Sequence, residues 1–253
     1  MVPFSFPAFL FILESSSMNQ FTRSEWLLGK EAIEKLHECR VALFGVGGVG
    51  GAAMEALARA GIGAIDLIDN DVVSLTNLNR QLVATHETIG QKKVDVGEKR
   101  ILSIYPECKV KKFPLFYLPG ETQIDFAQYD YVIDAIDTVK AKLDIIKKCQ
   151  EAGVPVISAL GCGNRLDPGK LLVTDLFKTE NDPLAKVMRR EARALGIKKL
   201  KVVCSKELPL KPNKEEEEGK ISSPGSSPFV PPVAGYLLAS EVIKDLLERN
   251  DGE

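Results

Sequence analysis

A run of glycines between two apolar segments most constrains how this chain can fold. It comes directly after the apolar segment 40–44 and reads Gly45-Val46-Gly47-Gly48-Val49-Gly50. Between a strand and a helix, such glycines let the backbone turn tightly and approach a pyrophosphate at the helix N-terminus. Asp69 ends the next apolar segment, where a carboxylate can meet a ribose hydroxyl. The spacing predicts a nucleotide site, but the motif alone does not distinguish NAD from ATP.

The hydrophobic pattern alternates between strand and helix along the chain. This alternation predicts an α/β fold, Rossmann-like and doubly wound, with a mostly parallel sheet and helices on both faces. Strands are expected at 40–44, 64–69, 109–113, 131–134, 154–158, 171–173 and 202–204. Helices are expected at 24–38, 50–60, 93–104, 140–152, 183–195 and 232–248. The first helix would start at Ser24 and have Trp26, Leu27, Ile33 and Leu36 on its apolar side.

We expect a single domain over residues 18–253. Residues 1–17 are apolar but have no basic residue before the apolar stretch and contain two prolines, so we interpret them as a poorly ordered extension rather than a targeting signal. Residues 211–228 are acidic and rich in Ser, Pro and Gly, which predicts a mobile surface loop within the domain. No segment is long and apolar enough to predict a membrane span.

Charge and cysteine usage narrow the function classes. The net charge of −2 gives no overall field for nucleic acid, so RNA would have to bind a local patch. The five cysteines include no Cys-x-x-Cys pair, and there are only two histidines. This argues against a disulfide framework and against a Cys₄ zinc site, and favours a reducing, cytoplasmic location.

The segment after Asp69 separates ATP from NAD. It runs Asp69-Asn-Asp71, then Asn77-Leu-Asn-Arg80-Gln81, then Gly90-Gln-Lys-Lys93. With the glycine turn, these elements resemble the ThiF/MoeB/HesA superfamily of adenylating enzymes, over residues 20–250. The resemblance implies that Arg80 and Lys93 bind the outer phosphates of ATP, with nucleotide contacts from Gly45, Gly47, Gly48, Gly50, Asp69, Asp71, Asn77 and Gln81. An arginine fork and a lysine suit a polyphosphate, whose charge exceeds what one helix terminus can stabilise.

The same resemblance implies two further catalytic residues. Asp137 follows the strand 131–134 and corresponds to the family's aspartate that serves Mg²⁺; Asp134 lies deeper and ranks below it. Arg23 resembles the family's N-terminal arginine that reaches the ATP of a partner subunit, which implies a homodimer. An exposed arginine beside a helix start is the alternative for Arg23.

The later part of the chain concerns the carboxylate that is activated. The motifs are Gly161-Cys-Gly-Asn-Arg-Leu-Asp-Pro168, Thr174–Thr179, Asp182–Arg190 and Phe229–Gly235. They resemble the tRNA threonylcarbamoyladenosine dehydratase branch, whose members use ATP to cyclise a threonylcarbamoyl group. Activation of a ubiquitin-like sulfur-carrier protein is the alternative within the same chemistry, and a sulfur-transfer protein is a possible partner. An NAD-dependent oxidoreductase and a non-catalytic nucleotide-sensing scaffold are the alternatives from other classes.

A row of basic residues is the expected RNA contact. Its members on the helix 183–195 share one face, and three lysines follow: Lys186, Arg189, Arg190, Arg193, Lys198, Lys199 and Lys201. A solvated helix face is the alternative. Cys204 is the cysteine best placed to act as a nucleophile, but a lone cysteine at a strand end is more often structural. Cys162, between two glycines, could approach the ligand.

Overall fold

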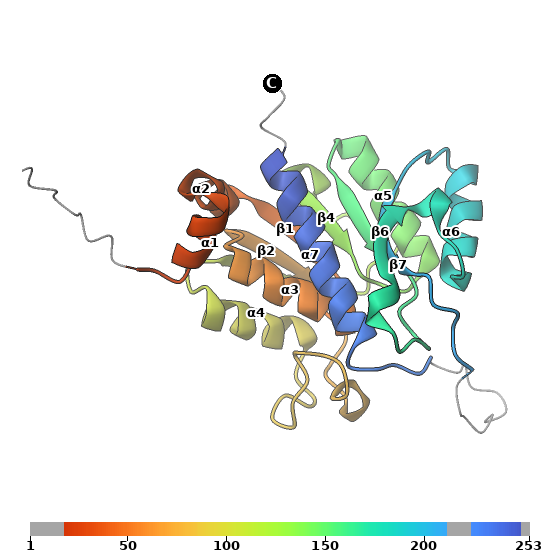
Figure 1. Cartoon of the computed structure of the whole chain (residues 1–253), viewed down its shortest axis with the longest axis horizontal. Coiled ribbons are helices and arrows are strands. Elements are labelled where there is room, and N and C mark those ends of the chain that lie inside the picture. The colour runs from red at the N-terminus through yellow and green to blue at the C-terminus, as the bar shows by residue number, and fades with distance from the viewer. Residues whose placement is uncertain (1–17, 212–223, 249–253) are drawn as a thin grey trace, which may run out of the picture.

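The computed structural model describes residues 18–211 and 224–248 and contains one seven-stranded sheet (Figure 1). Its strands are β1 (Arg40–Phe44), β2 (Ala64–Ile68), β3 (Lys109–Phe113), β4 (Tyr131–Asp134), β5 (Val156–Ala159), β6 (Leu171–Asp175) and β7 (Lys201–Ser205). Their order across the sheet is β3-β2-β1-β4-β5-β7-β6. All neighbours pair in parallel except β6, which runs antiparallel to β7 at the edge.

The central strands explain why the apolar segments are nearly continuous. β1 lies between β2 and β4, with Leu43 opposite both Leu67 and Ile133. Side chains along a strand point alternately to the two faces of the sheet. When helices cover both faces, the side chains on both are buried. Every residue of β2 and β4 is buried, including Asp66 and Asp134. The predicted α/β class and mostly parallel sheet are confirmed.

Helices cover both faces of the sheet, as predicted. One face carries α2 (Lys30–Glu38), α3 (Gly48–Ala60), α4 (Lys93–Ile104) and α7 (Val230–Glu248), which share one hydrophobic core. The other face carries α5 (Val139–Ala152) and α6 (Pro183–Ala194). α7 packs closely along α3, where a Cβ on Gly235 would lie 2.1 Å from the carbonyl oxygen of Val49. The C-terminal helix is therefore seated directly behind the glycine turn.

The expected helix over 24–38 is instead two helices. α1 (Thr22–Leu28) ends at Gly29, whose φ of 91° interrupts the helix before α2 begins. Trp26 and Leu27 are 74% and 82% exposed, so their assignment to a buried side was wrong. Gly29 changes the direction of the chain between the exposed Trp26 and Leu27 of α1 and the buried residues Ile33 and Leu36 of α2.

The remaining elements differ from expectation only at their ends. β5 begins after Pro155 because proline has no N–H to donate to the ladder. α3 and α7 each begin two residues earlier than expected. Residues 1–17 and 212–223, which were expected to be poorly ordered and mobile, lie outside the described residues. Within the residues described, no helix has the length and apolar character to cross a membrane.

Candidate nucleotide site

A cavity of about 590 Å³ opens at the carboxyl ends of β1 and β4. The chain leaves β1 toward α3 on one face of the sheet and β4 toward α5 on the other. The two connections therefore diverge and leave a crevice between them, which is where open α/β sheets bind ligands.

The glycine turn forms the inner wall of this cavity. Gly45 has a φ of 89°, and a Cβ there would lie 2.7 Å from the carbonyl oxygen of Ala135 in the loop after β4. α3 begins at Gly48 without a side-chain cap, so the N–H groups of its first turn lack side-chain acceptors. Gly50 does not line the cavity; a Cβ there would lie 1.8 Å from the Gly45 oxygen. It serves close packing, and the other three glycines form the wall.

Asp69 holds the glycine turn in place from the end of β2. One of its carboxylate oxygens accepts a hydrogen bond from the N–H of Val46 and the other from the N–H of Asp71, both at 2.7 Å. Burial raises the pKa of this carboxyl group, against the lowering effect of the Val46 N–H and of Lys93. Asp69 also lines the cavity, so it connects the glycine turn to the rest of the site.

Two cationic side chains, Arg80 and Lys93, line the cavity together with the glycine turn. Lys93 is 5% exposed, and its ammonium group lies 2.7 Å from a carboxylate oxygen of Asp71. Arg80 donates to the carbonyl oxygen of Thr76 at 3.0 Å and to the side chain of Asn79 at 2.8 Å. No carboxylate among the described residues pairs with Arg80. Arg80 is therefore available to pair with an anion in the cavity.

The polar residues beside Arg80 play different structural parts. Asn77 lines the cavity and caps the short turn Leu75–Asn77 by accepting from the N–H of Ser74 at 3.1 Å. Gln81 is 7% exposed, and its side-chain oxygen has no hydrogen-bond partner. A buried polar atom without a partner is costly, so the hydrogen bonding of the Gln81 amide is incomplete in this structure.

Two aspartates, one at the end of β4 and one three residues later, differ in burial and bonding. Asp134 is fully buried and accepts from Lys142 at 2.9 Å and from Ser158 at 2.5 Å. Its other carboxylate oxygen accepts from the N–H of Ile136 at 3.3 Å, so Asp134 is bonded within the fold. Asp137 is exposed to the cavity and has no hydrogen bond or ion pair to another described residue. Only Asp137 is free to bind a ligand.

Much of the opposite wall was not among the predicted site residues. Gly161, Cys162 and Gly163 line it, together with Leu184 from α6 and Pro224. A Cβ on Gly163 would lie 2.7 Å from a side-chain atom of Pro224, so the residues after 223 pack against this wall. The Gly-Cys-Gly spacing was a usable signal because it follows a strand.

Neither candidate cysteine has the character of a nucleophile. Burial raises the pKa of the Cys162 thiol to about 12 and that of Cys204 to about 11. A thiol that stays protonated at neutral pH is a poor nucleophile. The structural interpretation of Cys204 therefore stands, and Cys162 contributes shape to the wall.

An apolar part of the wall comes from the ends of β2, β3 and β4. It combines Ile68, Leu115, Phe116, Tyr117 and Ile136. Phe116 remains 57% exposed although it is aromatic and borders the cavity. The sequence pattern gave no signal for Leu115, Phe116 and Tyr117 because the segment 114–129 has no regular period.

Arg23 lies far from the cavity. It is exposed on α1, and Phe21 at the start of that helix packs against His37 and Tyr105 near the beginning of β2. The cavity lies at the other end of the strands. Arg23 could therefore meet a nucleotide only in another subunit.

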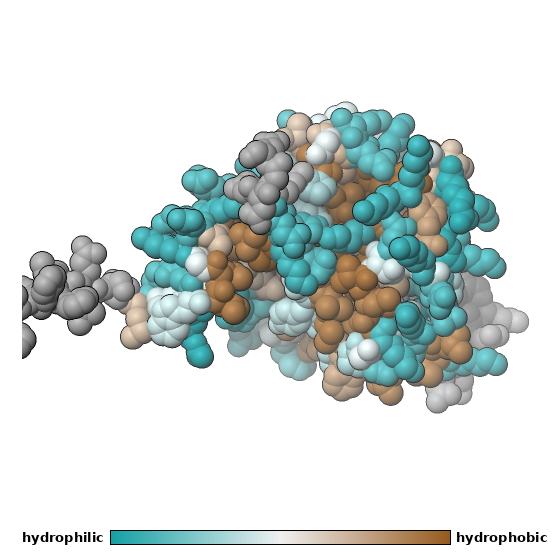
Figure 2. All heavy atoms as spheres, turned by 45° about the horizontal axis from the view of Figure 1, so that its top comes forward, coloured by the Kyte–Doolittle hydropathy of each residue, from teal (hydrophilic) through white to brown (hydrophobic). Residues whose placement is uncertain are grey.

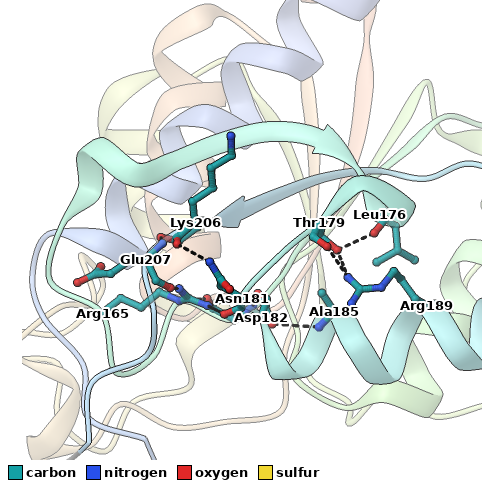
Figure 3. Close-up of polar contacts among 11 residues, drawn as sticks. Arg165, Leu176, Thr179, Asn181, Asp182, Ala185, Arg189, Lys206 and Glu207 are labelled. Atoms are coloured by element: carbon teal, nitrogen blue, oxygen red, sulfur yellow. Dashed lines mark hydrogen bonds and ion pairs between the residues drawn. The ribbon is translucent and has the colours of Figure 1, made fainter.

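The basic row is shorter than expected. Lys186, Arg190, Arg193, Lys198 and Lys199 are exposed. Arg189 instead donates to the backbone oxygen and hydroxyl of Thr179 (Figure 3). The guanidinium of Arg193 also lies over the ring of Phe177. Lys201 does not continue the row: its ammonium group lies 2.6 Å from Asp245 of α7, on the opposite face of the sheet.

The fold and the site define a class: an α/β protein with a Rossmann-like glycine turn beside a cavity lined by Arg80 and Lys93. Comparison with known proteins is more specific. Residues 21–253 match the model of the ThiF family, and the chain belongs to that family.

Two relatives are similar over nearly their whole length. The tRNA threonylcarbamoyladenosine dehydratase of Bacillus subtilis (strain 168) is 44% identical over 244 residues, covering 91% of this chain and 96% of the relative. The crystal structure of E. coli tRNA N6-threonylcarbamoyladenosine dehydratase in complex with AMP has a TM-score of 0.83 at 34% identity and covers 92% and 96% of the two chains. The same E. coli enzyme in complex with ATP has a TM-score of 0.81. Shorter similarity extends to the E. coli molybdopterin-synthase adenylyltransferase, 35% identical over 49% of this chain.

Proposed function

We propose that this chain is an ATP-dependent tRNA threonylcarbamoyladenosine dehydratase. It activates the threonylcarbamoyl carboxylate of the modified tRNA by adenylation and then closes a ring. The observation that carries the proposal is the convergence of the glycine turn, Arg80, Lys93 and Asp137 on one cavity. Similarity to two dehydratases over more than nine tenths of their length supports the choice of substrate.

ATP fits the charges of this cavity better than NAD does. The first turn of α3 offers N–H groups and the positive end of a helix dipole to one phosphate. Arg80 and Lys93 supply two further positive charges for the outer phosphates. Asp69 would bind the ribose, and the apolar wall with Phe116 would hold the base; both line the cavity. A nicotinamide dinucleotide would leave Lys93 and Arg80 without this partner.

Magnesium fits Asp137, with most of its ligands coming from elsewhere. Among the described residues no group of three or more His, Cys, Asp or Glu side chains could hold a metal ion. Mg²⁺ commonly takes one or two carboxylates and completes its shell with water and substrate phosphates. The free carboxylate of Asp137 meets this need, and the ion would neutralise phosphate charge when bound.

The reaction requires no nucleophile from the enzyme. A carboxylate oxygen of the substrate attacks the α-phosphorus of ATP, and pyrophosphate leaves with the electrons of the broken P–O bond. A nitrogen of the same modified nucleoside then attacks the activated carbonyl carbon, loses its proton, and displaces AMP. The second step is intramolecular and gains a high effective molarity. The protonated thiols of Cys162 and Cys204 agree with this scheme.

The homodimer is part of the proposal. Large apolar side chains remain exposed on α1, on α7 and in the segment between β2 and α4: Trp26, Leu27, Tyr236, Val72, Leu75 and Leu82. Figure 2 shows apolar residues gathered on the face along which α7 runs. Covering such a face with a second copy would remove this surface from water. Arg23 would then reach the partner's nucleotide.

The decisive experiment supplies the purified protein with ATP, Mg²⁺ and threonylcarbamoyl-modified tRNA. We expect release of pyrophosphate and AMP and loss of one water from the modified nucleoside, measured by mass spectrometry. Unmodified tRNA is the matched control and should give neither. Pyrophosphate exchange that requires a small ubiquitin-like protein and ignores tRNA would instead establish sulfur-carrier activation. Turnover is expected in the cytoplasm, where tRNA and ATP are both available.

A further inference from the structure

A buried guanidinium joins three chain segments beside the cavity. Arg165 is 3% exposed and donates to the carbonyl oxygen of Gly161 at 2.9 Å, of Asn181 at 3.1 Å and of Glu207 (Figure 3). These acceptors come from the loop after β5, the segment before α6 and the segment after β7. A planar guanidinium with five N–H groups can bind three carbonyls in fixed directions, whereas a lysine ammonium cannot match this geometry.

Two carboxylates complete this junction, which comprises Arg165, Asp182 and Glu207. Asp182 accepts from the N–H of Gly161 at 3.0 Å and from the N–H of Ala185 at 3.0 Å, so it ties the loop to the first turn of α6. Glu207 accepts from the N–H groups of Leu166 and Asp167, each at 3.0 Å. All three charged side chains of the junction thus hold the backbone of the loop 161–167.

The junction lies between two surfaces that the RNA would contact, the cavity wall and the basic side of α6. On one side, Gly161, Cys162 and Gly163 line the cavity, and Leu184 in the first turn of α6 lines it beside them. On the other side, α6 carries the exposed Lys186 and Arg190. None of the three junction residues lines the cavity itself. They fix the wall relative to the helix without touching the contents of the cavity.

We infer that Arg165 is a positioning residue for the RNA substrate. By clamping the Gly161–Gly163 wall to the start of α6, it sets where a modified nucleoside enters once its tRNA lies on the basic helix. The inference rests on the proposed dehydratase function. The nucleotide half of the cavity, with the glycine turn, Asp69 and Arg80, makes no contact with Arg165. ATP binding is therefore independent of this clamp.

The test compares Arg165→Gln, Arg165→Lys and the wild type in three measurements. These are the thermal shift caused by ATP and Mg²⁺, tRNA affinity by filter binding, and single-turnover cyclisation with saturating modified tRNA. We expect Arg165→Gln to keep ATP and tRNA affinity within about twofold but to lower the cyclisation rate about tenfold or more, because displacement of a substrate by about 1 Å can cost this much. Arg165→Lys should recover part of the rate.

Arg40→Gln is the matched structural control. Arg40 also forms an ion pair within the fold, with Asp66 at 2.9 Å, but near the start of β1, away from the cavity. It should lower the melting temperature without a selective loss of cyclisation. A normal cyclisation rate in Arg165→Gln, or parallel losses of ATP affinity, tRNA affinity and rate, would overturn the inference while the proposed function stood. A wild type that forms no cyclic product would overturn both.

Discussion

The ammonium group of Lys93 lies 2.7 Å from a carboxylate oxygen of Asp71, although Lys93 is buried and the Asp71 side chain is 58% exposed. Asp71 also accepts the backbone N–H of Lys93 at its own carbonyl oxygen, at 2.9 Å. The ion pair holds the Lys93 ammonium group at the cavity wall, where a phosphate of the nucleotide could also contact it.

Lys93→Ala is expected to lower pyrophosphate release by about a hundredfold or more, because one preorganised charge facing the developing charge is removed. Single-turnover pyrophosphate release with modified tRNA measures this. Lys92→Ala, at an exposed neighbour of the same charge, is the matched control and should retain wild-type activity. Full turnover in Lys93→Ala would show that Lys93 does not stabilise the departing pyrophosphate.

Gly50→Ala is expected to destabilise the fold by about 3 kcal/mol, because its Cβ would meet the Gly45 carbonyl oxygen at 1.8 Å and this backbone cannot yield easily. Urea unfolding measures the free energy. Gly51→Ala, one residue later in α3, meets nothing closer than 3.9 Å and should be neutral or stabilising by up to about 1 kcal/mol. Equal unfolding free energies for the two variants would contradict the packing role given to Gly50.

Lys186→Gln combined with Arg190→Gln should weaken tRNA binding about tenfold at low salt. The dependence of log affinity on log salt should also become shallower by roughly 1.5, since two phosphate contacts are lost. Lys244→Gln is the control, because this exposed lysine lies on α7 across the sheet. An unchanged salt slope in the double variant would show that the basic face of α6 is solvated and does not contact the tRNA.

Mixing two inactive variants tests the dimer. Arg23→Ala retains Lys93, and Lys93→Ala retains Arg23, so a mixed dimer would contain one complete site if Arg23 acts on the partner's nucleotide. Random exchange of subunits should then restore about a quarter of wild-type activity. Each variant alone should remain impaired. Activity no greater than the average of the two separate variants would show that Arg23 does not act across subunits.

Alkaline pH should destabilise the protein through its buried thiols. Burial raises the pKa of Cys39, Cys108 and Cys204 to about 11 and that of Cys162 to about 12, from an ordinary value of 9.0. Between about pH 9 and these values the unfolded chain loses thiol protons that the folded chain keeps, so the free energy of unfolding falls as pH rises.

At pH 10 each of these thiols should cost about 1 kcal/mol relative to pH 8. Urea unfolding of the wild type and of Cys162→Ala at both pH values isolates one thiol. The drop between pH 8 and pH 10 should be smaller in Cys162→Ala by about that amount. An identical drop would mean that the Cys162 thiol titrates normally in the folded protein.

The sequence predicted what depends on local spacing. The glycine turn, Asp69 and the group Asn77-Arg80-Gln81 lie within 37 residues (45–81) and adjoin two predicted strands, so their convergence follows from the parallel sheet. Arg165 could not be placed in this way, because its bond to the Glu207 carbonyl spans 42 residues. This bond depends on the position of β7 in the sheet, which local spacing does not predict.

Two errors have equally specific causes. Lys201 was counted with the basic helix because it follows Lys198 and Lys199, but β7 alternates its side chains between faces and directs Lys201 toward α7. The single helix over 24–38 overlooked Gly29, since one glycine within a helical pattern is often tolerated. Both errors arose where one residue decides the direction of a side chain or of the chain.

The contact between Gly45 and the Ala135 carbonyl has a consequence for stability as well as for binding. The cavity is lined by residues from both halves of the sheet, which meet where the loop after β1 touches the loop after β4. Separating the two halves would disrupt the nucleotide site. A saturating nucleotide therefore opposes the opening of either half, and its protection should extend across the domain. Amides in β5 and α6, remote from the phosphates, are expected to exchange more slowly with ATP bound.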